Sequence, residues 1–210
     1  DATPAARTAA LRRYADRESR ALLEKSLRDW RGAPREQILS ELVARRAPTP
    51  RRVAALLRSV NPAGDRAWFV AELAARAPKS AELSGGAIAR LYDTLGPEAL
   101  ELADRAWVAR VEPLDLWLAG QLWASPTATR KELLAASEAP RAEATAWLFK
   151  TRNKHAQERR LRELREQDAF VRIHARWARL GYPFDSLVPS YATAIGTSAD
   201  RPAALAELMG

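Results

Sequence analysis

The side chains best suited to bind a charged partner lie in one basic segment of this sequence. Between Lys150 and Arg165, seven cations stand against two acids. A concentration of positive charge on one helix favours contact with a polyanion. The candidate polyanion contacts are Lys150, Arg152, Lys154, Arg159 and Arg160. A solvated helix face explains the same residues, because mixed charges such as Arg162 and Glu166 can pair at a spacing of four residues.

A helix-turn-helix overlaps this segment and gives it a second interpretation. Its first helix would be Thr129–Ala136, its turn Ser137–Pro140 and its recognition helix Arg141–Arg152. A recognition helix needs basic and polar side chains that reach bases and phosphates in the major groove. The candidates for those contacts are Arg141, Lys150, Arg152, Asn153 and Lys154. Other three-helix units share this outline, so DNA binding stands as an alternative function.

Signatures of catalysis and metal binding are missing from the sequence. There is no cysteine, which excludes disulfides, thiolate zinc sites and cysteine nucleophiles. None of the five lysines has a serine three positions before it, and Gly-x-Ser-x-Gly does not occur. The two histidines, His155 and His174, lack any ligand spacing typical of zinc. We therefore predict no catalytic residue, no metal site and no cofactor.

The composition predicts closely packed helices with a basic surface. Apolar residues make up 47% of the chain and the net charge is +8. This charge favours an anionic partner such as nucleic acid, anionic lipid or an acidic cell-wall polymer. It is equally typical of a GC-rich genome that encodes surface cations as arginine.

Helix-start signals recur along the chain and support an all-α fold. Thr3-Pro4 and Thr49-Pro50 each place a capping residue before a proline, and Asp65 can cap a further helix. Thr129 and Glu132 have capping-box spacing, and Gly96-Pro97 is expected to start a short helix. We predict a multi-helix bundle of about nine or ten helices. One basic helix should begin near Trp147, and a second should run through Phe170.

Tryptophans mark a change in character near residue 103. Trp107, Trp117 and Trp123 fall close together, beside an almost wholly apolar helix that follows Pro113. Such a helix is usually central. We predict a helical region over 1–103 and a Trp-rich region over 104–210, with room for two packed subdomains. After the connector that begins at Leu180, a last helix should start near Thr197.

The tail resembles a segment of known cell-wall enzymes. Residues 194–208 read Ala-Ile-Gly-Thr-Ser-Ala-Asp-Arg-Pro-Ala-Ala-Leu-Ala-Glu-Leu. This segment resembles the part of class A penicillin-binding proteins that lies between the second and third catalytic motifs of the transpeptidase domain. The stretches Trp147–Arg152 and Arg179–Gly196 are similar to proteobacterial peptidoglycan glycosyltransferases of family 51. The resemblance covers about Trp147–Gly210.

The resemblance implies a periplasmic protein of peptidoglycan synthesis, associated with the inner membrane through a segment outside this chain. Its catalytic motifs do not carry over, because Ser-x-x-Lys, Ser-x-Asn, Lys-Thr-Gly and the acidic glycosyltransferase motifs are all absent from the stretch that carries the resemblance, Trp147–Gly210. We therefore expect a non-catalytic or accessory helical region, taken from a longer protein. Its partner would be the anionic membrane surface, the glycan or another cell-wall protein. The DNA-binding alternative would place it in the cytoplasm.

Overall fold

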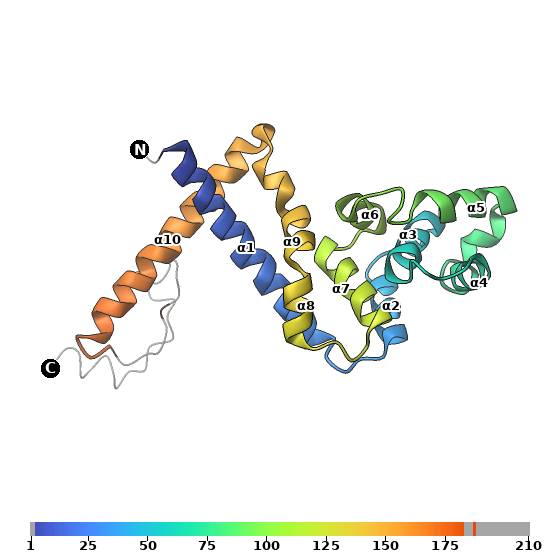
Figure 1. The fold of residues 1–210 in the computed structure, drawn as a ribbon, viewed down its shortest axis with the longest axis horizontal. Helices are drawn as coiled ribbons and strands as arrows, with labels where there is room; N and C mark the ends of the chain where they lie inside the picture. Colours follow the sequence, from blue (N-terminus) through green and yellow to red (C-terminus); the bar gives the residue numbers. More distant parts are fainter. Residues whose placement is uncertain (1–2, 183–186, 188–210) are drawn as a thin grey trace. The chain divides into compact units, whose positions relative to one another are not determined.

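The computed structural model describes residues 3–182 and Leu187, and these residues are all helix, turn and loop. They form ten α-helices and no strand, which confirms the all-α prediction (Figure 1). The α-helices are α1 (Pro4–Asp29), α2 (Arg35–Ala44), α3 (Pro50–Val60), α4 (Arg66–Arg76), α5 (Gly85–Thr94), α6 (Leu102–Ala109), α7 (Pro113–Ala124), α8 (Arg130–Ala136), α9 (Glu138–Thr145) and α10 (Lys154–Ala178). The 3-10 helices are η1 (Pro78–Glu82), η2 (Ala146–Phe149) and η3 (Thr151–Asn153).

The chain divides into two compact units. The central unit is Ala15–Trp147, and the terminal unit joins Asp1–Tyr14 to Leu148–Gly210. The sequence predicted a boundary near residue 103, whereas the structure places that position inside the central unit, at the start of α6. The physical reason is that α6 packs against α3, so helices from both sides of residue 103 share one core.

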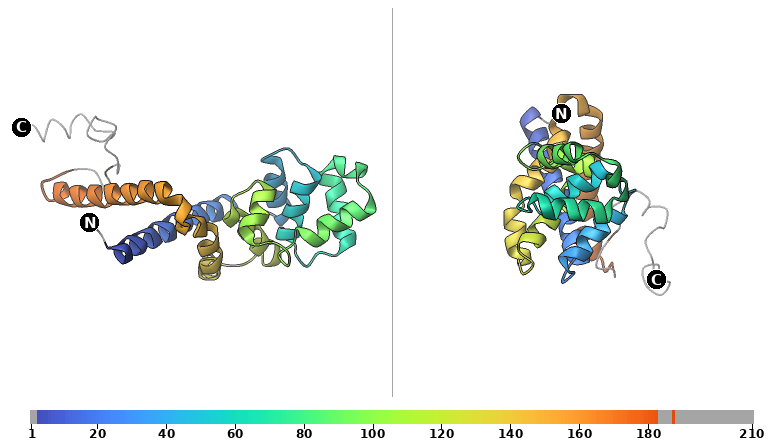
Figure 2. Two further views of the ribbon diagram at one scale, coloured as in Figure 1. Left: turned by 90° about the horizontal axis from the view of Figure 1, so that it is seen from above. Right: turned by 90° about the vertical axis from the view of Figure 1, so that its right-hand side faces the viewer.

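Helix α3 is the centre of the central unit. Its residues from Arg52 to Val60 are all buried. It packs against α2, α4, α5, α6 and α7 (Figure 1), and the same cluster of helices is seen from two other sides in Figure 2. Burial of a single leucine or valine side chain contributes about 1.5–3 kcal/mol. The apolar run Val53–Leu57 is fully buried and therefore contributes several kcal/mol of hydrophobic stabilisation.

Helix α7 also lies in the core, as its apolar sequence predicted. Leu114, Leu116 and Leu118 are fully or almost fully buried. Its approach to α3 depends on Gly120, where an added Cβ would lie 3.0 Å from the carbonyl oxygen of Ser59. The absence of a side chain at Gly120 thus sets the separation of the two helices.

The helix starts predicted at Thr3, Thr49, Asp65 and Thr129 are correct in position, and all of these residues except Thr49 form the cap. Thr3 accepts a hydrogen bond from the Ala6 amide at 3.2 Å, and Asp65 accepts one from the Trp68 amide at 2.7 Å. Thr129 and Glu132 form the capping box, and the hydrogen bonds from Thr129 lower the pKa of Glu132. Thr49 precedes α3 without a side-chain cap hydrogen bond.

Two short segments differ from the sequence prediction. Gly96-Pro97 forms a turn instead of a helix start, and this turn brings Glu98 within 3.1 Å of the buried Arg58 guanidinium. Of the predicted turn Ser137–Pro140, only Ser137 is a turn residue, because α9 begins at Glu138. Pro140 falls in the first turn of α9, where the missing amide hydrogen of proline costs nothing.

The terminal unit contains one long helix where the sequence predicted two. Residues Trp147–Asn153 lie largely in η2 and η3, and α10 then runs without a break from Lys154 to Ala178. No glycine or proline interrupts these 25 residues, and Leu161, Leu164 and Phe170 are buried along the helix. The predicted connector beyond Tyr182 and the last helix near Thr197 lie outside the described residues.

Candidate anion-binding surfaces

Three of the five predicted polyanion contacts lie together before and at the start of α10. Lys150 precedes η3, Arg152 lies within η3, and Lys154 is the first residue of α10. All three residues are exposed. Within the described part of the chain, none of them forms an ion pair. Their charges are therefore available to an anionic partner.

The other two predicted contacts are engaged within the terminal unit. Arg160 Nη1 lies 3.0 Å from a Glu163 carboxylate oxygen, and Arg159 lies 4.0 Å from the same carboxylate. The Tyr14 hydroxyl donates to Glu163 at 3.2 Å, and the Arg160 guanidinium stacks 5.6 Å from the Tyr14 ring centroid. Arg159 and Arg160 therefore pair with a carboxylate of their own helix.

The predicted recognition helix Arg141–Arg152 does not exist as one element. Helix α9 ends at Thr145, and 3-10 turns follow it. Arg141 is buried, donates to the Ser137 hydroxyl at 3.0 Å and pairs with Asp16. The prediction of Arg141 as a DNA contact is therefore wrong, because its side chain joins α9 to α1 inside the central unit.

The histidines occupy ordinary positions on α10. His155 is exposed, and the half-buried His174 packs edge-to-face on Tyr182 with ring centroids 5.9 Å apart. Within residues 3–182 and Leu187, no three His, Asp or Glu side chains are grouped to hold a metal ion. Among the described helices, none is both long and apolar enough to cross a bilayer.

The structure assembles a basic surface that the sequence prediction did not single out. An open cleft of about 1260 Å³ in the central unit is lined by the end of α2, the start of α3 and the turn after α6. We call it the arginine cleft. Its charged and aromatic lining residues are Arg45, Arg46, Arg51, Arg52, Arg110, Glu112 and Trp107. The signal in the sequence is Arg45-Arg-Ala-Pro-Thr-Pro-Arg-Arg52, in which a pair of arginines stands on each side of Ala47–Pro50.

Arg52 is the buried anchor of the arginine cleft. Its guanidinium donates to the carbonyl oxygens of Leu42 at 2.5 Å and of Val43, Arg46 and Ala109 at 2.8 Å each. These carbonyls belong to the C-terminal ends of α2 and α6 and to the connector, where helix dipoles favour a cation. Burial lowers the pKa of Arg52, and the nearby charge of Arg46 adds to this effect.

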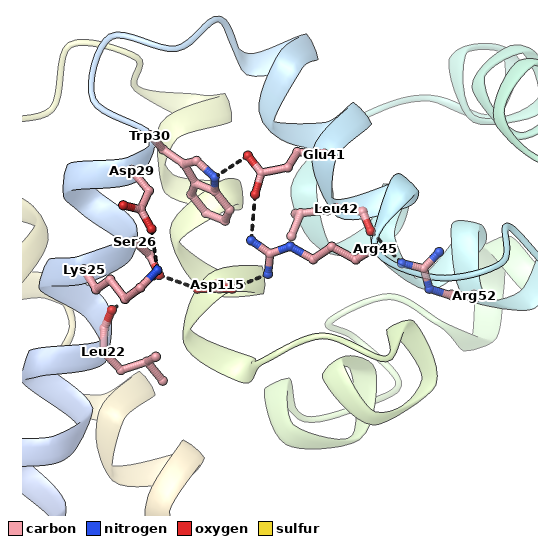
Figure 3. A network of polar contacts seen from close by, with 10 residues as sticks. All are labelled: Leu22, Lys25, Ser26, Asp29, Trp30, Glu41, Leu42, Arg45, Arg52 and Asp115. Atoms are coloured by element: carbon pink, nitrogen blue, oxygen red, sulfur yellow. Dashed lines mark hydrogen bonds and ion pairs between the residues drawn. The ribbon is translucent and has the colours of Figure 1, made fainter.

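Arg45 belongs to a network that joins α1, α2 and α7 (Figure 3). It pairs with Asp115 and, at 2.8 Å, with Glu41. The Ser26 hydroxyl donates to Asp115 at 2.5 Å, and the Trp30 indole donates to Glu41 at 2.9 Å. Burial by itself would lower the pKa of Arg45, but the hydrogen bonds to Asp115 and Glu41 raise it. Two carboxylates thus compensate this one guanidinium.

Three arginines of the cleft have no such compensation. Arg46, Arg51 and Arg110 are exposed, and none of them forms an ion pair in the portion of the chain that the structure covers. The Arg110 guanidinium stacks 4.8 Å from the centroid of Trp107, whose side chain is itself 70% exposed. The arginine cleft therefore combines free positive charge with an accessible indole.

Comparisons with protein-family models, with curated proteins and with solved structures find no match to this chain.

Proposed function

We propose that this chain is a non-catalytic, accessory helical region of a periplasmic peptidoglycan-synthesis protein. Its task is to dock on an anionic surface of the cell envelope. The resemblance of residues 147–210 to peptidoglycan glycosyltransferases and penicillin-binding proteins supports the cellular process. The absence of their catalytic Ser-x-x-Lys and Lys-Thr-Gly motifs from the sequence supports an accessory role.

The observation that carries the docking role is the group Lys150, Arg152 and Lys154. These cations are exposed at the start of α10, and the described residues offer them no ion pair. A cation close to an anionic membrane contributes about 1 kcal/mol of binding free energy. Three of them together would strengthen binding by a factor on the order of 100.

The test measures binding of the chain to vesicles of neutral lipid with and without an anionic lipid, and to purified peptidoglycan. We expect Lys150→Ala/Arg152→Ala/Lys154→Ala to weaken binding to the anionic surface on the order of 100-fold and to reduce its salt dependence. The matched control is Arg162→Ala/Arg165→Ala/Arg172→Ala, which removes the same charge from exposed positions of α10.

An equal loss in both triple variants would contradict the proposed docking site, because net charge alone would then explain binding. A salt-dependent interaction with duplex DNA that only the first variant loses would favour the DNA-binding alternative. Protease accessibility of the tagged parent protein in spheroplasts tests the location. Protection from the external protease would contradict a periplasmic position.

A further inference from the structure

We propose that the arginine cleft of the central unit is a binding site for a phosphate-bearing ligand. Arg46, Arg51 and Arg110 would hold the phosphate oxygens, and Trp107 would pack against the group attached to the phosphate. The proposal concerns residues of α2, α3 and α6 and their connectors. It stands apart from the docking function proposed for Lys150, Arg152 and Lys154.

The charge balance of the cleft calls for an anion. Arg45 is matched by Glu41 and Asp115, and Arg52 by four carbonyl oxygens. Among the described residues, Glu112 is the one acid that lines this cleft beside the remaining cations, Arg46, Arg51 and Arg110. Guanidinium groups present paired donors that match two phosphate oxygens, and a phosphate carries enough negative charge to engage more than one of them.

The walls of the cleft are held in place before any ligand arrives. Arg52 bonds the carbonyls that end α2 and the carbonyl of Ala109 that ends α6. It also bonds the carbonyl of Arg46, and Ala109 directly precedes Arg110. The buried guanidinium thus fixes the backbone at two of the three proposed ligand-binding residues. Such preorganisation reduces the entropy that binding would otherwise cost.

The backbone of Arg110 gives a second, independent indication. Arg110 has φ 55° and ψ 44°, which is the left-handed conformation. The Val111 amide bonds the Ala106 carbonyl and the Arg110 amide bonds the Trp107 carbonyl, so Arg110 occupies the position where a helix ending of this kind usually has glycine. A side chain in this conformation is strained. In this conformation the guanidinium lies over the ring of Trp107, and both residues line the cleft.

The cleft has room for a ligand larger than a phosphate ion. Its volume of about 1260 Å³ exceeds that of a typical small-molecule pocket, which is about 300–1,000 Å³. Trp107 offers an apolar face beside the cations. A phosphate ester, in which the phosphate is attached to a ring or a hydrocarbon chain, would use both features.

The test is calorimetric titration of the whole chain with inorganic pyrophosphate. We expect saturable binding with one site, weakened about tenfold or more by Arg51→Ala and by Arg110→Gly. Arg110→Gly also removes the strain of the left-handed conformation, so its melting temperature should be no lower than that of the wild type. If Arg110→Gly binds pyrophosphate more weakly but is as stable as the wild type, Arg110 acts in ligand binding and not only in the fold. Arg90→Ala, an exposed arginine on α5, is the control and should bind like the wild type.

Two further arms identify the source of the phosphate. If vesicles that contain an anionic phospholipid displace pyrophosphate, the ligand is a lipid headgroup. If they do not, it is a soluble phosphate ester. Absence of saturable pyrophosphate binding would overturn the proposal, as would binding that Arg51→Ala and Arg110→Gly leave unchanged. Binding only to a DNA duplex through the same arginines would overturn it in favour of nucleic acid. Failure of the Lys150, Arg152 and Lys154 variant in its own test would concern the docking function alone.

Discussion

At the scale of the residue, buried arginines of α3 hold the central unit together through carbonyl oxygens. Arg58 repeats what Arg52 does at the other end of the helix. It donates to the carbonyls of Pro62 at 2.7 Å and Tyr92 at 3.1 Å, and its guanidinium stacks 4.0 Å from the Tyr92 ring centroid. A buried cation is tolerated where hydrogen-bond acceptors surround it. Both arginines join α3 to segments that are distant in the sequence.

Arg52→Met should be strongly destabilising. Methionine fills most of the volume but donates no hydrogen bond, so four carbonyl oxygens lose their partner. We expect the free energy of unfolding to fall by about 3 kcal/mol, measured by urea denaturation. The neighbouring Arg51→Met is the control, because Arg51 is exposed, and it should change the free energy by less than about 0.5 kcal/mol. Equal effects would show that Arg52 does not anchor the helix ends.

At the scale of the element, the distance between α3 and α7 is set by a single glycine. The backbone carbonyl of Ser59 approaches Gly120 so closely that a methyl group has no room without a shift of one helix. Gly86, in the first turn of α5, has nothing within 4 Å of its missing Cβ. Both positions are glycines within helices. Gly120 is in close contact with the backbone of α3, whereas Gly86 faces open space.

The pair Gly120→Ala and Gly86→Ala should therefore have opposite effects on stability. Gly120→Ala should lower the free energy of unfolding by about 1–3 kcal/mol, because it overpacks the contact between α3 and α7. Gly86→Ala should raise it by about 0.5–1 kcal/mol, since alanine loses less conformational entropy than glycine when a helix forms. Thermal and urea unfolding measure both. A stabilising Gly120→Ala would disprove the close approach of the helices.

At the scale of the whole molecule, the main hydrophobic core belongs to one of the two units. All its buried members, from Leu23 to Leu133, lie within residues 15–147. The terminal unit buries a smaller set of apolar side chains among the described residues, including Leu11, Leu161 and Leu164. The cores of the two units are thus unequal in size.

A fragment of residues 15–147 should fold by itself. It keeps every member of the main core and every residue of the arginine cleft. We expect a helical circular dichroism spectrum, a single cooperative melting transition and pyrophosphate binding equal to that of the whole chain. A fragment of residues 148–210 should show no cooperative transition. If the fragment of residues 15–147 were unfolded, the central unit would depend on the terminal unit for its stability, which would contradict this prediction.

The sequence by itself determined the fold class and the places where most helices begin. Helical spacing of apolar residues and caps such as Asp65 and Thr129 act within one or two turns, so they can be recognised without the rest of the chain. The same local signals misled at Pro140, because proline marks a turn and a first helical turn equally well. Only the tertiary structure decided which cations are free. Arg141 pairs with Asp16, which is 125 residues away in the sequence and which no local pattern indicated. Arg159 and Arg160, in contrast, pair with Glu163 at the helical spacing that the sequence already offered. The residues of the arginine cleft are brought together by contacts between α2, α3 and α6, and such long-range contacts leave no pattern in a local stretch of sequence.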